Sequence, residues 1–282
     1  MSGSYTVRTI RRTDFAQCVA LTDLMDWGLA DEDFTFMVRL EAEGCFVAAR
    51  GTNILGLVTS VSFGNLGWIG NVIVSPRERK KGVGAALVSR AVEYLKNRGV
   101  ETIGLYAYKN VVPFYKNLGF SLSIEYSWMK CEYSNWRGAG YSHLRKTDFP
   151  AIVEFDEACF GGTRTRLLKA IYESSSSLCC SFLEEKCARA YLMAVKSQTS
   201  AEIGPWLCKK GYEEEAFQLF KSIGKELHGL ETHIGLPTSR HDLISFVTDL
   251  GFKENFQVVR MYHGPHPHDK ECVLAMESLE RG

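Results

Sequence analysis

The run from Val74 to Leu87 constrains the fold more than any other part of the chain. It joins an apolar segment, residues 68–74, to a segment with apolar residues at helical spacing, residues 85–98, which predicts a buried strand followed by a helix. A helix N-terminus carries unpaired N–H groups and partial positive charge, so it attracts anions. Gly82 and Gly84 lack a Cβ and would let a phosphate approach the backbone closely. The run therefore predicts a diphosphate site.

The pattern of this turn separates it from other phosphate motifs. Arg79, Lys80 and Lys81 add positive charge to its rim. The chain has neither G-x-x-x-x-G-K-[ST] nor G-x-G-x-x-G here, and the pattern is R-x-x-G-x-G. A second apolar segment, Thr102 to Tyr108, predicts another buried strand, and F-Y-K-N-L-G-F follows at residues 114–120.

This succession resembles the acetyl-CoA-binding core of the GNAT superfamily of N-acetyltransferases. The resemblance implies that the strand ending at Val74 splays from the next strand, and that its backbone binds pantetheine and polarises the acetyl oxygen. It also implies that Tyr115 protonates the departing thiolate. Asn110 is a loose match, because it lies only five residues before Tyr115. The residues assigned to acetyl-CoA are Val72, Ile73, Val74, Arg79, Lys80, Lys81, Gly82, Val83, Gly84, Ala85, Asn110 and Phe114.

Two sequence correspondences indicate a duplication. Arg11 to Phe15 recurs as Arg145 to Phe149, and Phe114 to Phe120 recurs as Phe246 to Phe252, both at an offset of about 133 residues. We therefore expect two α/β units, residues 1–133 and 140–282, each a mixed twisted sheet flanked by helices, which is the GNAT-like fold that the resemblance implies.

The second unit lacks the basic glycine loop and the tyrosine that the first unit carries. Residues 203–212 offer no R-x-x-G-x-G, and Val247 stands where the first unit has Tyr115. The chain resembles a tandem branch of the superfamily, in which a catalytic N-terminal unit precedes a degenerate C-terminal unit. That resemblance predicts acetyl-CoA binding in the first unit.

An acidic segment, Asp23 to Asp33, provides candidates for the acceptor pocket. In the GNAT fold this region forms one wall of that pocket, so the hypothesis is that Asp26 attracts a cationic amine and Trp27 packs against its carbon skeleton. The alternative is a solvated helix end. The sequence does not identify a general base.

The function that these features predict is an acetyl-CoA-dependent N-acetyltransferase, with acetyl-CoA as co-substrate. The amine would attack the thioester directly in a ternary complex, and a small-molecule amine is the favoured acceptor. Two alternatives remain open: a non-catalytic acyl-CoA-binding regulatory protein, and a protein-lysine acetyltransferase in which the second unit docks the protein substrate.

Composition narrows the partners and the compartment. The 33 basic and 33 acidic side chains cancel, which argues against nucleic acid or an anionic membrane as a partner. We expect a cytoplasmic protein, because the chain has neither a signal-peptide pattern nor a long apolar run. The nine cysteines, with no C-x-x-C, predict free thiols, and Cys179, Cys180 and Cys187 are expected to be buried and inert.

No metal site is predicted. His263, His266 and His268 cluster, but Pro265 and Pro267 separate them and no Cys or carboxylate set accompanies them at a familiar spacing. The sequence leaves open whether the chain forms a homodimer.

Overall fold

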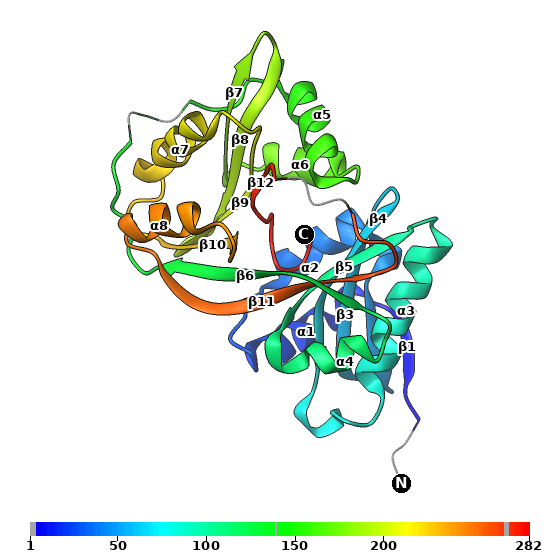
Figure 1. Ribbon diagram of the computed structural model, residues 1–282. Coiled ribbons are helices and arrows are strands. Elements are labelled where there is room, and N and C mark those ends of the chain that lie inside the picture. The colour runs from blue at the N-terminus through cyan, green and yellow to red at the C-terminus, as the bar shows by residue number, and fades with distance from the viewer. Residues whose placement is uncertain (1–3, 139, 141, 268–270) are drawn as a thin grey trace.

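The computed structural model describes residues 4–138, 140, 142–267 and 271–282. Figure 1 shows two units, each with helices against a sheet, joined by two long strands that cross between them. The mixed α/β fold predicted from the sequence is confirmed.

The first unit runs from the N-terminal strand to the first of the two long strands. It begins with one edge strand and two helices, continues through three antiparallel strands, and then alternates helix and strand. Its elements are β1 (Thr6–Thr9), α1 (Phe15–Asp23), α2 (Asp31–Leu40), β2 (Phe46–Arg50), β3 (Asn53–Phe63), β4 (Leu66–Val74), α3 (Val83–Asn97), β5 (Thr102–Tyr108), α4 (Val112–Lys116) and β6 (Ser121–Cys131).

The second unit repeats this order, beginning with its two helices. One short strand follows the last element of the repeat. Its elements are α5 (Phe149–Phe160), α6 (Thr165–Tyr172), β7 (Ser177–Glu184), β8 (Cys187–Lys196), β9 (Ser200–Cys208), α7 (Glu213–Ser222), β10 (Glu231–Pro237), α8 (His241–Asp249), β11 (Lys253–His263) and β12 (Val273–Ala275).

The repeated sequences occupy equivalent places in the two units. Arg11 to Phe15 leads into α1 and Arg145 to Phe149 leads into α5. Likewise Phe114 to Phe120 joins α4 to β6, and Phe246 to Phe252 joins α8 to β11. The duplication inferred from the sequence is therefore present in the fold.

The two units exchange their last strands. Within the described residues the strand order is β1-β2-β3-β4-β5-β11-β6-β10-β9-β8-β7, with β12 beside β9. Thus β11 pairs with β5 of the first unit, and β6 pairs with β10 of the second. The sequence predicts a sheet for each unit, whereas the structure forms one continuous sheet. Because β6 and β11 follow the same repeated motif, either strand suits the same position beside β5 or β10.

Helices cover both faces of the first unit's sheet. On one face α3 buries Leu87, Val88 and Ala91 against Ile69 of β4. On the other face α1 and α2 bury Phe15 and Phe34 against β2 and β3. Burying these side chains supplies the hydrophobic stabilisation of the unit, and it also fixes the start of α3 at the end of β4.

Two smaller expectations need correction. Cys159 of α5 and Cys272 form a disulfide across 113 residues, because the fold brings their Cα atoms to 5.9 Å. Burial raises the pKa of Cys179 and of Cys180 to about 12, as expected for inert thiols, but Cys187 is exposed at the start of β8.

Candidate functional site

Strands β4 and β5 diverge beside the predicted cofactor loop. In these two fully described strands the parallel pairing covers Leu66 to Trp68 of β4 with Thr102 to Gly104 of β5. Beyond Trp68, β4 stays paired with β3 but leaves β5, and the register shifts around Asn71, whose φ of 50° marks a bulge. The predicted splay is confirmed.

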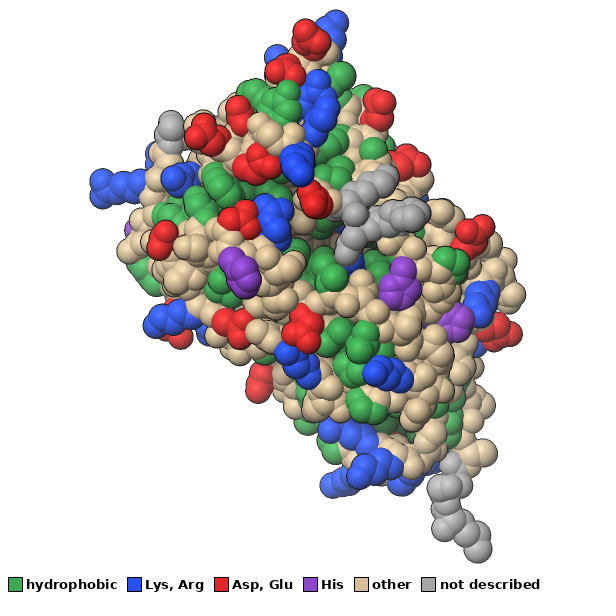
Figure 2. All heavy atoms as spheres, in the orientation of Figure 1, with side chains coloured by type: hydrophobic (Ala, Val, Ile, Leu, Met, Phe, Trp, Pro, Cys, Tyr) green, Lys and Arg blue, Asp and Glu red, His purple; other side chains and the backbone are tan. Residues whose placement is uncertain are grey.

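The basic loop lies between β4 and α3, as the sequence predicts. Figure 2 shows Lys and Arg side chains gathered at the lower end of the molecule, where Figure 1 places this loop. Arg79, Lys80 and Lys81 are exposed, and Gly82 caps α3 with a φ of 83°. Val83, Gly84 and Ala85 form the first turn of α3, so their N–H groups have no carbonyl partner within the helix. The loop therefore has the charge and geometry for a diphosphate.

Arg79 also contacts the strand that it follows. Its Nε donates a hydrogen bond of 3.1 Å to the Val74 carbonyl oxygen. The Val74 carbonyl, expected to pair with pantetheine, thus already has a partner on an exposed and movable side chain.

Gly84 joins the loop to the splayed strand. A Cβ at this position would lie 3.4 Å from the ring of Phe114 and 3.5 Å from the Val74 side chain, which is ordinary van der Waals contact. The fold itself therefore tolerates a side chain here, and a glycine leaves room between α3, β4 and α4. The structure brings together Val74, Gly84 and Phe114, three of the residues predicted for the cofactor.

Tyr115 is buried in the same core cluster, with its ring against those of Phe114 and Phe120. Burial raises the pKa of Tyr115, so the phenol stays protonated at neutral pH. A protonated phenol is the form that a general acid needs. By contrast, Asn110 is exposed in the 3-10 turn before α4.

The two residues predicted for the acceptor wall lie in different surroundings. Trp27 is half-buried in the connection between α1 and α2. Burial raises the pKa of Tyr108 at the end of β5, and a hydrogen bond with Trp27 partly opposes that rise. Asp26 is exposed, with a φ of 54°. The structure thus places Trp27 beside the splay and Asp26 at the surface.

The second unit has a matching divergence, but the chain itself fills it. Parallel pairing of β9 with β10 covers Ser200 to Ile203 and Glu231 to Ile234. Beyond these pairs β12 enters, pairing with Trp206 and Leu207 of β9. On the other side, the Met276 N–H donates a 3.2 Å hydrogen bond to the Gly235 carbonyl of β10.

Glycines on both flanking strands make room for this inserted segment. A Cβ on Gly204 would meet the Met276 carbonyl oxygen at 2.0 Å, and a Cβ on Gly235 would meet the Met276 side chain at 2.6 Å. Gly204 corresponds to Gly70 of β4, at the same offset as the repeated motifs. The gap of the second unit is therefore built to hold the protein's own chain.

The loop after β9 is shorter than the loop after β4, and it leads into an acidic helix. It spans residues 209–212, whereas the loop after β4 spans residues 75–82. Helix α7 then opens with Glu213, Glu214 and Glu215, and Glu213 accepts hydrogen bonds from the Gly211 N–H at 2.9 and 3.1 Å. Carboxylates at a helix N-terminus occupy the position that would favour an anion and repel a diphosphate.

Two family models match the chain. The acetyltransferase (GNAT) family model matches residues 7–120, and the model of an acetyltransferase (GNAT) domain matches residues 152–274. This chain belongs to the GNAT superfamily and carries two GNAT domains. The interval between the matches contains the boundary predicted at residues 133–140, which stays a prediction.

Relatives of this GNAT acyltransferase span most of its length. An uncharacterized N-acetyltransferase of Bacillus subtilis is 23% identical over 82% of this chain and 82% of its own length. The holothin acyltransferase of a Pseudoalteromonas species is 24% identical over 93% of this chain and 89% of its own.

Solved structures share the tandem fold. A protein of Pyrococcus horikoshii superposes with a TM-score of 0.83 at 18% identity, covering 100% of this GNAT chain and 97% of that chain. A tandem GNAT protein of the clavulanic acid biosynthesis pathway superposes with a TM-score of 0.64 at 16% identity, covering 94% and 100%. At such identities the superpositions show the fold alone.

The described residues of the GNAT chain were also compared with the requirements of a metal site and of a membrane span. No three His, Cys, Asp or Glu side chains gather as metal ligands in the described residues, which exclude His268. His266 instead lies 2.6 Å from the Ser121 hydroxyl. Nor does any helix in the described part of the chain have the length and apolar character to span a membrane.

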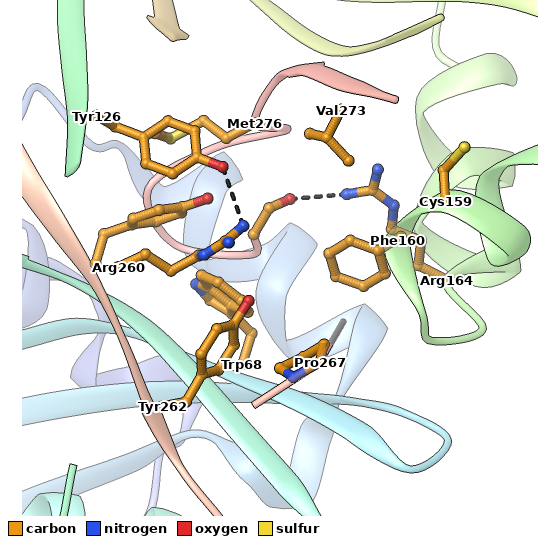
Figure 3. A pocket seen from close by; sticks show the side chains of 12 residues that line it. Trp68, Tyr126, Cys159, Phe160, Arg164, Arg260, Tyr262, Pro267, Val273 and Met276 are labelled. Carbon is orange, nitrogen blue, oxygen red and sulfur yellow. Dashed lines mark hydrogen bonds between the residues drawn. The ribbon is translucent and has the colours of Figure 1, made fainter. Parts of the chain in front are cut away.

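A small cavity of about 30 Å³ lies between the two units. Figure 3 shows Arg260 of β11 and Arg164 approaching it from opposite sides, with Trp68 and Tyr262 below. A volume of this size suits a water molecule rather than a substrate. The cavity therefore marks the seam between the units, where Arg164 donates a 2.8 Å hydrogen bond to the Gly282 carbonyl.

Sequence reasoning missed the segment after β11. Nothing in the spacing of residues 273–282 indicates a strand that enters one unit and a continuation that reaches the other. Gly70, Gly204 and Gly235 are a local trace of this segment, because each lies where the segment passes within contact of the sheet.

Proposed function

We propose that the first unit binds acetyl-CoA and transfers its acetyl group to a primary amine, while the second unit binds no acyl-CoA. The observation that carries this proposal is the contrast between the two splays: β4 leaves β5 beside a basic loop, whereas the gap between β9 and β10 holds β12. In this assignment the loop from Arg79 to Ala85 holds the diphosphate, and the backbone of Val72 to Val74 holds pantetheine.

The chemistry follows from direct attack in a ternary complex. The amine nitrogen bonds to the thioester carbonyl carbon, the carbon–sulfur bond breaks, and Tyr115 protonates the departing thiolate. An alkyl amine has a pKa of about 10.4, so only about one molecule in a thousand is neutral near pH 7.4. The site must therefore also accept a proton from the amine.

A small molecule is the favoured acceptor. Trp68 and Gly70 point to the face of β4 opposite α3, and the second unit together with residues 276–282 covers that face. A compact amine fits such a covered site better than the surface of a folded protein. The relative named holothin acyltransferase supports an acceptor of this kind.

Calorimetric titration with acetyl-CoA tests the assignment directly. We expect one molecule bound per chain, because the second gap is filled. Two molecules per chain would contradict the assignment of the second unit, and no binding would contradict that of the first. A panel of small amines and lysine peptides, with release of the CoA thiol as readout, then separates transfer from the regulatory alternative of binding without turnover.

A further inference from the structure

The segment after β12 leaves the second unit and lies across the first. Figure 1 shows it ending between the two units. Arg281 pairs with Glu277 at 3.0 Å and lies over the ring of Phe36 in α2, 5.2 Å from its centre. Glu280 passes so close to β4 that a Cβ on Gly70 would lie 2.5 Å from its Cα. We call residues 276–282 the crossing segment.

The crossing segment lies on the face from which an acceptor must approach. Side chains alternate along β4, so Ile69 packs under α3 while Gly70 faces the crossing segment. Because α3 covers one face of the splay, a molecule that meets the thioester between β4 and β5 has to come from the other. Glu280 is therefore on the acceptor side, next to the point where the strands part.

The surroundings of Glu280 agree with this position. Burial is the largest effect that raises its pKa, with Glu277 adding to it and Arg281 opposing it. Its charge also acts on Tyr108, the last residue of β5, and on Glu202 of β9.

Glu202 completes the set of groups that face Glu280. Its pKa is raised by burial and then by Glu280, and less so by Glu277 and by Asp33 of α2, while Arg281 lowers it. Because the two carboxylates interact, the loss of a proton from one makes the loss of a proton from the other less favourable. Such a pair attracts a cationic amine and holds a proton more tightly than an exposed carboxylate does.

We propose that Glu280 is the base that takes the proton from the acceptor amine. This inference rests on the acyl transfer proposed for the first unit. The ammonium first pairs with the carboxylates of Glu280 and Glu202. Glu280 takes one proton from the ammonium, which frees the lone pair of the nitrogen for attack on the thioester carbon. As the carbon–sulfur bond breaks, the thiolate takes a proton from Tyr115, and the second proton of the nitrogen returns to Tyr115 through solvent. The second unit thus contributes a catalytic residue to the site of the first, by way of the crossing segment.

The decisive variant is Glu280→Gln, which keeps the shape of the side chain and removes its charge. We expect kcat/KM for the best amine of the panel to fall by about 100-fold or more, with acetyl-CoA affinity unchanged. The wild-type profile should rise with pH as Glu280 ionises, and this acidic limb should disappear in the variant. Glu271→Gln, at an exposed residue of the preceding connection that pairs with Lys210 at 3.4 Å, is the matched control.

A second variant guards against a merely structural effect. Glu202→Gln keeps the proposed base and removes one of the two groups that bind the ammonium, so KM for the amine should rise while the acidic limb of the pH profile persists. An unchanged pH profile in Glu280→Gln, in a wild type that transfers acetyl groups, would overturn this inference alone. A wild type that binds acetyl-CoA and acetylates no amine would overturn the proposed function and this inference with it.

Discussion

The two GNAT units of this chain share an order of elements and differ in what their diverging strands hold. In the first unit β4 and β5 part beside a basic glycine loop, and in the second β9 and β10 part around β12. The first helix turn after the splay is flanked by Arg79 to Lys81 in one unit and contains Glu213 to Glu215 in the other.

This difference teaches how a duplicated fold can divide its tasks. A splayed pair of strands leaves backbone edges and apolar surface that need a partner. The first unit can take that partner from a ligand, whereas the second takes it from its own chain. Filling the gap also delivers the crossing segment to the first unit. Four further experiments test this comparison.

The largest expected effect concerns the ion pair that fixes the second unit to the crossing segment. Arg164 and Asp156 are almost completely buried and form hydrogen bonds of 2.8 to 3.1 Å, and Tyr191 also donates to Asp156. Asp156→Ala leaves the guanidinium buried without its carboxylate, and we expect a loss of about 3–5 kcal/mol in the free energy of unfolding, measured with urea.

The first unit provides the contrast. Thr22 stands at the position equivalent to Asp156 and bonds to the Val19 carbonyl within its own helix. Glu93→Ala, which removes an exposed partner of Arg90, should cost less than about 1 kcal/mol. Equal losses in Asp156→Ala and Glu93→Ala would remove the idea that buried contacts tie the second unit to the crossing segment.

The next largest effect is on acetyl-CoA binding, and it compares the N-terminus of α3 with that of α7. Gly84→Glu places bulk and negative charge where the diphosphate is proposed to bind, so calorimetry should detect no acetyl-CoA binding. Glu214→Lys, which adds positive charge to the exposed first turn of α7, should leave the affinity unchanged. Normal binding by Gly84→Glu would exclude the basic loop as the cofactor site.

Tyr115→Phe tests whether the phenol present only in the first unit takes part in the chemistry. We expect kcat to fall by about 10- to 1000-fold with unchanged acetyl-CoA affinity. Since burial raises the pKa of Tyr115, the phenol should remain protonated through neutral and mildly basic pH. Tyr133→Phe, at an exposed residue beyond β6, is the control. Full kcat in Tyr115→Phe across this range would assign the proton donor elsewhere.

The smallest expected effect comes from removing one lysine charge from the loop of each unit and comparing the acetyl-CoA affinities. Lys81 is exposed and lies 3.5 Å from Glu78, so Lys81→Ala should weaken acetyl-CoA binding by about two- to fivefold at low salt and less at high salt. Lys210→Ala makes the same change in the loop of the second unit and should have no effect. If both variants weaken binding alike, the loss reflects overall charge and not the loop.

Much of the first unit could be predicted because its signals are local. The apolar strand, the glycine turn and the following helix are contiguous, so the placement of β4, Gly82 and α3 followed from neighbours in the sequence. The repeated motifs likewise gave the order of the second unit. Cys159 and Cys272 escaped detection because their pairing depends on contacts across 113 residues.

The sequence by itself determined the superfamily, the duplication and the unit that carries the basic loop, because these depend on residue types at short, fixed spacings. Only the tertiary structure decided that β6 and β11 change places, that β12 fills the second gap, and that Glu280 packs against Gly70 of β4 in the first unit. The physical reason is that strand pairing and buried charge are set by partners far apart in the chain, and two equivalent units offer each strand two equivalent partners.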